Sequence, residues 1–497
     1  MMGDKTVLAL RVFAGAAVMG VLGDLLLRQF PWGLNVFLWL AALVATVPMI
    51  VWLQPSAGAR VNWWMLAPVI LFAVFFVWRA SVPLKLMDVL AILVALALVS
   101  PLVGQARVPL ASLFHYFAAA VAAGAYAAFG TLALVFGDID WKEVSRENRG
   151  RPVLAVGRGV VLAVPPLLVF GVLLMSADVV FDNLLRSTFH INVPRLFSHA
   201  VLIFFCGWIV AGTLRRVLIG NNLPQEPKEL PRLFSLGITE VGIVLGLLDL
   251  LFLAFVAVQV RYLFGGASLV GITPGLSYAE YARRGFFELV AVAALVLPLL
   301  LAAHWLLRQD NPRHARIFRA AAGAQIILLF VIMASALERM RLYTDQFGLT
   351  EQRLCATAFM AWLAVVFVWF ALTVLRGRRE RFAFGAMLAG FALIGALQFV
   401  NPDALIARTN LERANQGRKF DASYVSTLSA DAVPALAAHL QELKPQDSRT
   451  IATRILKQWP AGKRSDWRSW SWGRARAAQA VENHRAALEQ MSGTAEH

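Results

Sequence analysis

The stretch LGITEVGIVLGLLDLLFLAFVAVQV, at residues 236–260, decides the fold class of this chain. It contains only two charged residues, Glu240 and Asp249. About 20 apolar residues in a helix cross the roughly 30 Å of hydrocarbon in a bilayer, so this stretch is long enough to span a membrane. A run of this length and composition predicts a transmembrane helix.

The pattern recurs along most of the chain, where we count about twelve apolar blocks. The overall composition agrees, because 59% of residues are hydrophobic and 15% are charged, whereas soluble domains carry roughly a quarter charged residues. We therefore expect an all-α fold, a polytopic transmembrane bundle of about 12 helices over residues 1–400. The expected spans are 7–27, 33–53, 62–78, 86–104, 113–136, 157–175, 196–214, 236–260, 285–306, 317–337, 354–375 and 382–400.

Residues 401–497 differ from the rest and contain no spanning block. Amphipathic stretches at 402–415, 430–443 and 474–491 predict short helices, which together form a small C-terminal helical region outside the membrane. Ser429 and Asp431 occupy positions typical of a helix N-cap. The run WRSWSW at 467–472 either rests against the membrane face or packs its tryptophans internally.

The orientation follows from the positive charge of the loops. Basic residues gather in 137–158, 215–235, 308–319 and 376–381, in alternate connections between blocks. Such loops remain on the cytoplasmic side. The C-terminal region is then extracytoplasmic, and twelve spans would put both termini outside. The positive charges of Lys5 and Arg11 oppose that placement of the N-terminus.

The composition and motifs also exclude several classes of function. The formal charge of +16 lies mostly in short loops, where membrane topology explains it, so we expect no nucleic-acid binding. No nucleophile motif, phosphate-binding loop, dinucleotide fingerprint or zinc spacing occurs. We therefore expect no catalytic residue, no metal site and no cofactor. An enzyme is the weakest of the functional hypotheses.

Asp249 is the carboxylate that lies deepest within an expected span. Ionisable groups inside a membrane are costly and often mark ion or proton pathways. Asp249 is thus a candidate proton or cation site. The alternative is a structural carboxylate that is paired with an arginine or with backbone groups of a neighbouring helix.

The densest polar cluster lies on the side assigned as outside, in two segments. The first, TPGLSYAEYARRGFFEL at 273–289, places charges at four-residue intervals on one helix face. The second, at 338–354, mixes arginines, carboxylates and a tyrosine. These arginines either clamp an anionic group or form an ion-pair network with the carboxylates. The candidate binding residues are Glu280, Tyr281, Arg284, Glu288, Arg341, Tyr343, Asp345 and Arg353.

Four segments of the second half carry a resemblance to a known family. They are SYAEYARRGFFELVAVAAL, ERMRLYTDQFGLTEQRL, NPDALIARTNLERA and FDASYVSTLSADAVPAL. They resemble a bacterial multi-pass membrane family described only as domain of unknown function 4173, related to 4153. The likeness covers roughly residues 220–440, and GDLLLRQFPWGLN in the first half adds a weaker match. The resemblance implies a membrane location and a bacterial origin, and it implies no activity.

We therefore expect a multi-pass protein of a bacterial cytoplasmic (inner) membrane, with the lipid bilayer as its first partner. The leading hypothesis is a receptor, scaffold or accessory component that meets an anionic ligand or an envelope protein at the outer face. The alternatives are a secondary transporter of a small or anionic solute that uses Asp249, and an enzyme that modifies lipid or an envelope polymer.

Overall fold

The computed structural model describes most of the chain as helices. The described residues are 3–100, 108–147, 193–220, 236–270, 286–307, 311–460, 462 and 466–493, with single positions between 159 and 178. Within them, the only non-helical pairing is one isolated bridge between Leu236 and Leu307. The predicted all-α class is confirmed.

Ten described helices are long and apolar enough to cross a membrane, and α3 (Leu66–Trp78) is a shorter apolar helix. Eleven of the twelve expected blocks correspond to these helices; the block at 157–175 falls mostly outside the described residues. The chain is therefore a multi-pass integral membrane protein. The ten helices are α1 (Asp4–Leu27), α2 (Leu34–Leu53), α4 (Val82–Val99), α5 (Leu113–Ala133), α9 (Val193–Leu218), α10 (Ile238–Val270), α12 (Phe286–Leu306), α13 (Pro312–Phe347), α14 (Glu351–Thr373) and α15 (Phe382–Val400).

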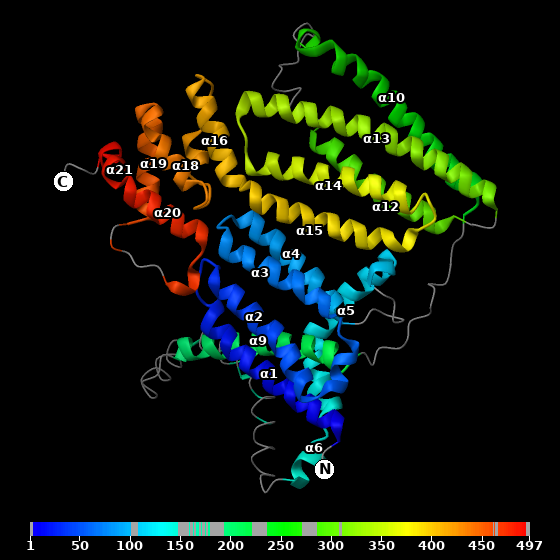
Figure 1. The fold of residues 1–497 in the computed structure, drawn as a ribbon, viewed down its shortest axis with the longest axis vertical. Helices are drawn as coiled ribbons and strands as arrows, with labels where there is room; N and C mark the ends of the chain where they lie inside the picture. The colour runs from blue at the N-terminus through cyan, green and yellow to red at the C-terminus, as the bar shows by residue number, and fades with distance from the viewer. Residues whose placement is uncertain are drawn as a thin grey trace.

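The spanning helices form two bundles that meet along α15 (Figure 1). The first bundle contains α1 to α5 and α9, and the second contains α10, α12, α13 and α14, each around its own hydrophobic core. On α15, Phe384 and Phe391 pack against the first core, and Phe382 is buried in the second. This single helix therefore joins the two halves of the molecule.

Small residues allow helices far apart in sequence to approach closely. Gly20 of α1 lies against α9, where an added Cβ would be 2.5 Å from the carbonyl oxygen of Ile203 and 3.3 Å from Gly207 Cα. Between membrane helices, such close backbone packing replaces much of the hydrophobic driving force available in water. It fixes α9 beside α1.

The C-terminal region is a helical unit with its own core. Its elements are α16 (Pro402–Asn415), α17 (Ala422–Val425), α18 (Val433–His439), α19 (Pro445–Gln458), α20 (Trp472–Asn483) and α21 (Arg485–Ser492). Side chains such as Ile406, Leu436, Ile451 and Val481 are buried together. The sequence predicted α16 with the same limits and missed α19. The expected N-cap at Asp431 was wrong, because α18 begins two residues later and the Asp431 carboxylate bonds elsewhere.

The first described residues and the C-terminal region lie at opposite ends of α1, which corrects the expectation that both termini are on one side. At the start of α1, the Gly3 N–H donates to the Glu143 carboxylate at 2.9 Å. Near its end, the Leu25 carbonyl accepts from Arg468 of the C-terminal region at 2.8 Å. The N-terminus thus shares the face of the basic connections, as the positive charge of Lys5 favours.

Helix α5 explains why counting apolar blocks placed the N-terminus on the wrong side of the membrane. The turn before it, Val108–Leu110, contacts the turn Arg379–Arg381 between α14 and α15. Just after it, Asp138 pairs with Lys5 at 2.9 Å and with Arg215 at 2.5 Å. Both ends of α5 therefore lie at the face opposite the C-terminal region. A helix long enough to span has not changed the side of the chain.

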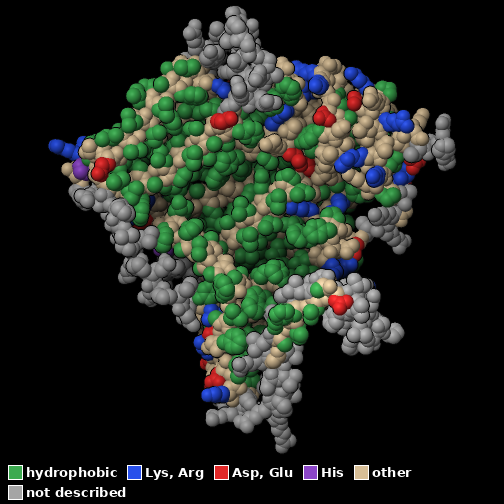
Figure 2. Space-filling view, turned by 180° about the vertical axis from the view of Figure 1, so that it is seen from behind, with side chains coloured by type: hydrophobic (Ala, Val, Ile, Leu, Met, Phe, Trp, Pro, Cys, Tyr) green, Lys and Arg blue, Asp and Glu red, His purple; other side chains and the backbone are tan. Residues whose placement is uncertain are grey.

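The surface agrees with a molecule that lies across a bilayer. Figure 2 shows hydrophobic side chains over the middle of the molecule, where the surface is hollowed. Charged side chains gather over the C-terminal region and at the opposite edges. Exposed Trp467, Trp470 and Trp472 lie in the segment that contacts the end of α1 and the start of α2. Exposed tryptophans at that level support the expectation that the WRSWSW run rests at the membrane face.

Candidate functional site

A small polar cavity lies where the C-terminal region meets the end of α3, the start of α4 and the end of α15. Its volume is about 40 Å³. We call it the junction site. The residues that line it are Arg79, Asn401, Ala404, Arg408, Asp431, Pro434, Ala435, Trp472, Gly473 and Arg476.

Arg79 forms one wall of the junction site. Helix α3 ends at Trp78, and Pro83 lies in the first turn of α4, so Arg79 is held in a short turn between them. Its Nε donates to the Gln398 carbonyl at 2.7 Å, and its guanidinium lies 4.6 Å from the Trp78 ring centroid. Burial lowers the pKa of Arg79, although the nearby Asp431 carboxylate opposes this. A fixed, buried cation results.

Asp431 lies opposite Arg79 and binds the start of α4. Its Oδ2 accepts hydrogen bonds from the backbone N–H groups of Ala80, at 2.6 Å, and Ser81, at 3.2 Å. Burial raises the pKa of Asp431, while the bond from Ala80 and the charge of Arg79 oppose that rise. A Cβ at Gly473 would overlap Asp431 Oδ1, so only glycine admits this approach.

The rim of the junction site is cationic. Arg408 of α16 and Arg476 of α20 are exposed, and neither makes an ion pair or a hydrogen bond through its guanidinium with the residues that the structure describes. Nearby, burial lowers the pKa of Arg474 to about 10. Three arginines, Arg79, Arg408 and Arg476, thus line a cavity with one carboxylate, Asp431. That carboxylate already accepts hydrogen bonds from two backbone N–H groups.

The left-handed backbone of Asn401 sets the direction of α16. Asn401 has φ 54° and ψ 78°, a conformation that asparagine tolerates better than most residues. Its side chain accepts from the Ala404 N–H at 3.4 Å, and Pro402 occupies the first turn. This turn directs Asp403 into the protein, where it is fully buried.

Fully buried Asp403 and half-buried Glu351 form a carboxyl pair next to the junction site. They line a cavity of about 10 Å³ together with Ser81 and Cys355. The Glu351 carboxyl lies beside Asp403 and interacts with it, and no other described residue donates to the Asp403 oxygens. Two adjacent carboxylates repel each other, so a proton held between them stabilises the pair.

The segment at 338–353 forms the corner between α13 and α14. The Arg353 guanidinium stacks 4.0 Å from the Tyr343 ring centroid and donates to the Gly348 carbonyl. The backbone carbonyl of Asp345 accepts from Arg413 at 2.9 Å, which joins this corner to α16. Among the described residues, no ion pair connects the predicted arginines and carboxylates, so the expected ion-pair network is absent there.

The structure describes only some of the other predicted residues of the outer cluster. Glu288 and Arg341 are both exposed, and no ion pair joins them. Glu280, Tyr281 and Arg284 lie outside the described residues. Binding by this cluster therefore remains a prediction.

Asp249 lies in the second bundle, on the same face of α10 as buried Leu245, Phe252 and Val256. Its Oδ1 is buried and has no hydrogen-bond partner among the described residues. The alternative hypothesis was that Asp249 is paired with an arginine or with backbone groups. The described residues provide no such partner for its Oδ1. No described group of three His, Cys, Asp or Glu residues is placed to hold a metal ion.

Comparison with known proteins gives one match. A family model described as a domain of unknown function (DUF4153) matches residues 66–439. The chain belongs to this family. The match agrees with the resemblance seen in the sequence, and it includes Arg79, Asp403 and Asp431 but ends before Trp472. Neither the curated proteins nor the solved structures contain a match.

Sequence reasoning missed the junction site because its residues come from segments about 350 residues apart. Arg79 was visible as one of two charges, with Lys85, in the short connection at 79–85 between apolar blocks. Asp431 was visible too, but it was assigned to a helix cap. The sequence signal for the junction site was a polar residue in a connection too short to form its own structure.

Proposed function

We propose that this protein is a membrane-embedded receptor or accessory component that binds an anionic group at the junction site. The supporting observation is the unbalanced charge of the cavity, where Arg79, Arg408 and Arg476 face a single carboxylate, Asp431. Asp431 carries one negative charge against three positive charges, so it does not neutralise all of them. An incoming anion would.

The chemistry of arginine favours a phosphate or carboxylate group. Planar guanidinium groups bind such anions through paired hydrogen bonds. Arg79 is preorganised by its bond to the Gln398 carbonyl and its stacking on Trp78. Burial already lowers its pKa, so a bound anion would also relieve the cost of a charge held away from water. Exposed Arg408 and Arg476 would close over the ligand.

The same proposal places the junction site on the outer face of a bacterial cytoplasmic membrane. The basic connection at 376–381 and the N-terminus lie at the opposite end of the spanning helices. Positive loops remain in the cytoplasm. The natural ligands would then be anionic constituents of the cell envelope, including an anionic segment of an envelope protein.

Phosphate binding by the purified full chain tests the proposal. In detergent, inorganic phosphate should raise the thermal unfolding midpoint above that in sodium chloride of equal ionic strength. Replacing Arg408 and Arg476 by Gln should weaken phosphate binding about tenfold or more, since a hydrogen bond to a charged group contributes about 1.5–3 kcal/mol. The matched control replaces exposed Arg454 and Lys457 of α19 by Gln. Acetate serves as the carboxylate probe in the same assay. The proposal would be refuted if both double variants lost phosphate affinity equally, or if neither phosphate nor acetate raised the unfolding midpoint of the wild-type chain.

A second candidate function, transport of a proton or small cation, is supported by unpartnered polar atoms inside the second bundle. Helices α10 and α13 pack together and begin at the same face, and Ser335 Oγ donates to Gln259 Oε1 at 3.1 Å. Asp249 and Gln325 each precede one member of this pair by ten residues. They should therefore lie at one level, and Gln325 is fully buried with both amide atoms unpartnered among the described residues.

Proton flux in proteoliposomes distinguishes this candidate. The wild-type chain should dissipate an imposed pH gradient, and Asp249→Asn should not, while its thermal stability stays unchanged. The control is Glu338→Gln, which removes an exposed carboxylate from α13. A large loss of stability in Asp249→Asn would indicate a structural carboxylate instead.

A further inference from the structure

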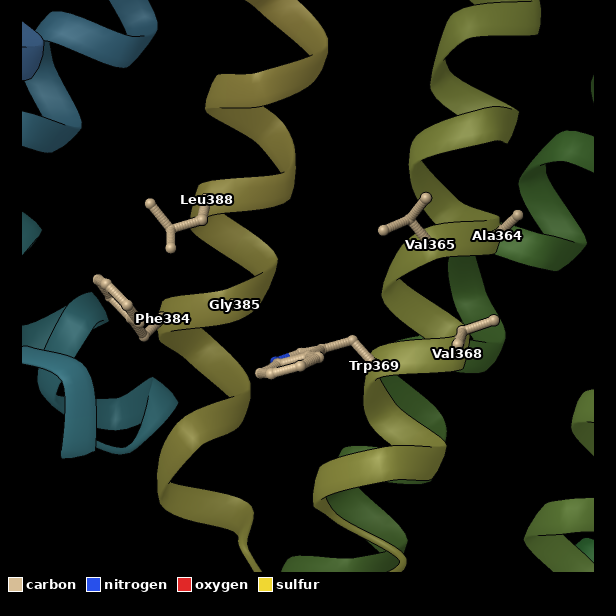
Figure 3. A pocket seen from close by; sticks show the side chains of 7 residues that line it. All are labelled: Ala364, Val365, Val368, Trp369, Phe384, Gly385 and Leu388. Atoms are coloured by element: carbon tan, nitrogen blue, oxygen red, sulfur yellow. The ribbon is translucent and has the colours of Figure 1, made fainter.

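A groove between α14 and α15 has the properties of a lipid-chain site. Its volume is about 560 Å³, within the range of ligand pockets. Every side chain in its lining is apolar apart from one indole N–H, which donates to the Arg381 carbonyl at 3.2 Å. A hydrophilic ligand would find no free partner there. The lining residues are Ala364, Val365, Val368, Trp369, Phe384, Gly385 and Leu388 (Figure 3).

The groove is shaped by one glycine. Figure 3 shows the Trp369 ring extending from α14 toward α15 at the position of Gly385. A Cβ on Gly385 would overlap the Trp369 indole, so the ring lies against bare backbone. By contrast, Gly395 on the same helix has open space where a Cβ would be. Trp369 therefore depends on Gly385 for its place in the groove.

One end of the groove carries a cluster of arginines. The connection from α14 to α15 contains Arg376, Arg378, Arg379 and Arg381 against a single acid, Glu380, and all five are exposed. None of the four guanidinium groups forms an ion pair or hydrogen bond with the residues that the structure describes. The chain passes from Arg381 to Gly385 in one helical turn, so the charges stand directly above the groove.

Membrane topology accounts for basic residues in this connection, but it does not account for a groove beside them. An apolar slot within the hydrocarbon layer, with arginines at the level of the headgroups, matches a lipid that carries an acyl chain and a phosphate. We propose that this groove binds an anionic phospholipid of the bilayer, with an acyl chain along Trp369 and Leu388 and its headgroup among the arginines of 376–381.

Native mass spectrometry of the full chain in detergent tests the proposal. Phosphatidylglycerol should bind about fivefold more tightly than phosphatidylcholine with the same acyl chains. Replacing the four arginines by Gln should abolish that preference. Replacing Lys419, Lys444, Arg454 and Lys457, four exposed cations of the C-terminal region, should preserve it.

Two further variants examine the groove itself. Gly385→Ala should weaken binding of both lipids by displacing Trp369, whereas Gly395→Ala should leave binding unchanged. The junction-site double variant of Arg408 and Arg476 should keep the preference for phosphatidylglycerol, which separates this proposal from the one above. Equal binding of the two lipids by the wild-type chain, or a preference that survives loss of the four linker arginines, would overturn it.

Discussion

Replacing Asp431 by Ala should weaken the attachment of the C-terminal region to the spanning bundle. The carboxylate is 5% exposed and accepts from the N–H groups of Ala80 and Ser81. Without it, the buried N–H of Ser81 and the partly buried N–H of Ala80 lose their partner, at about 1–3 kcal/mol each, or about 2–6 kcal/mol in total. Asp431→Asn keeps an acceptor oxygen and should cost about 1–2 kcal/mol.

The assay is unfolding of the full chain in detergent, followed by circular dichroism and by proteolysis after Val400. Asp431→Ala should lower the free energy of unfolding most, and Asp431→Asn should lower it less. Glu412→Ala should lower it by no more than about 0.5 kcal/mol. Glu412 is the control because it is exposed and lies on α16 of the same region. If Asp431→Ala behaves like Glu412→Ala, or if Asn is as damaging as Ala, the two hydrogen bonds do not hold this junction.

The pH dependence gives an independent check on the same residue. Burial raises the pKa of Asp431 in the folded chain. Its protonated form is therefore favoured by folding, and this contribution is complete below the ordinary aspartate pKa of about 4. It is lost as the pH rises from there through the raised pKa. Asp431→Asn should remove this part of the decline in stability, and an unchanged pH profile would contradict the argument.

Two further predictions concern topology and a backbone turn. After removal of the native cysteines, Cys at exposed Gln446 should react with an impermeant maleimide in intact spheroplasts, whereas Cys at Asp4 or Asn311 should react only after permeabilisation; labelling of all three in intact spheroplasts would reverse the assignment. Gly348→Ala should destabilise the corner between α13 and α14 by about 1–3 kcal/mol, because Gly348 has φ +84° and a Cβ there would overlap Asn410; the unfolding midpoint measures this, and Gly395→Ala is the control with open space.

The spans were predictable from sequence because hydrocarbon imposes a length and a composition on each helix separately. Helix α16 was predictable for a similar local reason, since Asn401 and Pro402 mark its start. Helix α5 shows the limit of this approach. Its composition matches a span, yet the contacts of Asp138 with Lys5 and Arg215 return its end to the starting face.

The site was less predictable because a polar residue does not reveal its partner. Arg353 is predicted to bind an anion or an acid, and its observed contacts are stacking on Tyr343 and a hydrogen bond to a backbone carbonyl. Asp431 was expected to cap its own helix, but it binds backbone groups about 350 residues away. In both cases the partner is main chain at a helix end, which no side-chain pattern indicates.

The same preference explains how the C-terminal region is attached. Its contacts with the bundle are directed at the unpaired backbone groups that every helix leaves at its ends. Asp431 accepts from N–H groups at the start of α4, and the Trp470 carbonyl accepts from Leu34 at the start of α2. Arg413 donates to carbonyls at the end of α13, and Arg468 to one at the end of α1. Acid at a helix start and arginine at a helix end also match the helix dipole. The Glu351 N–H at the start of α14 likewise donates to the Tyr424 hydroxyl, so the C-terminal region caps five helices at once. The junction arginines Arg408 and Arg476 take no part in this capping, which leaves their charge available to a ligand.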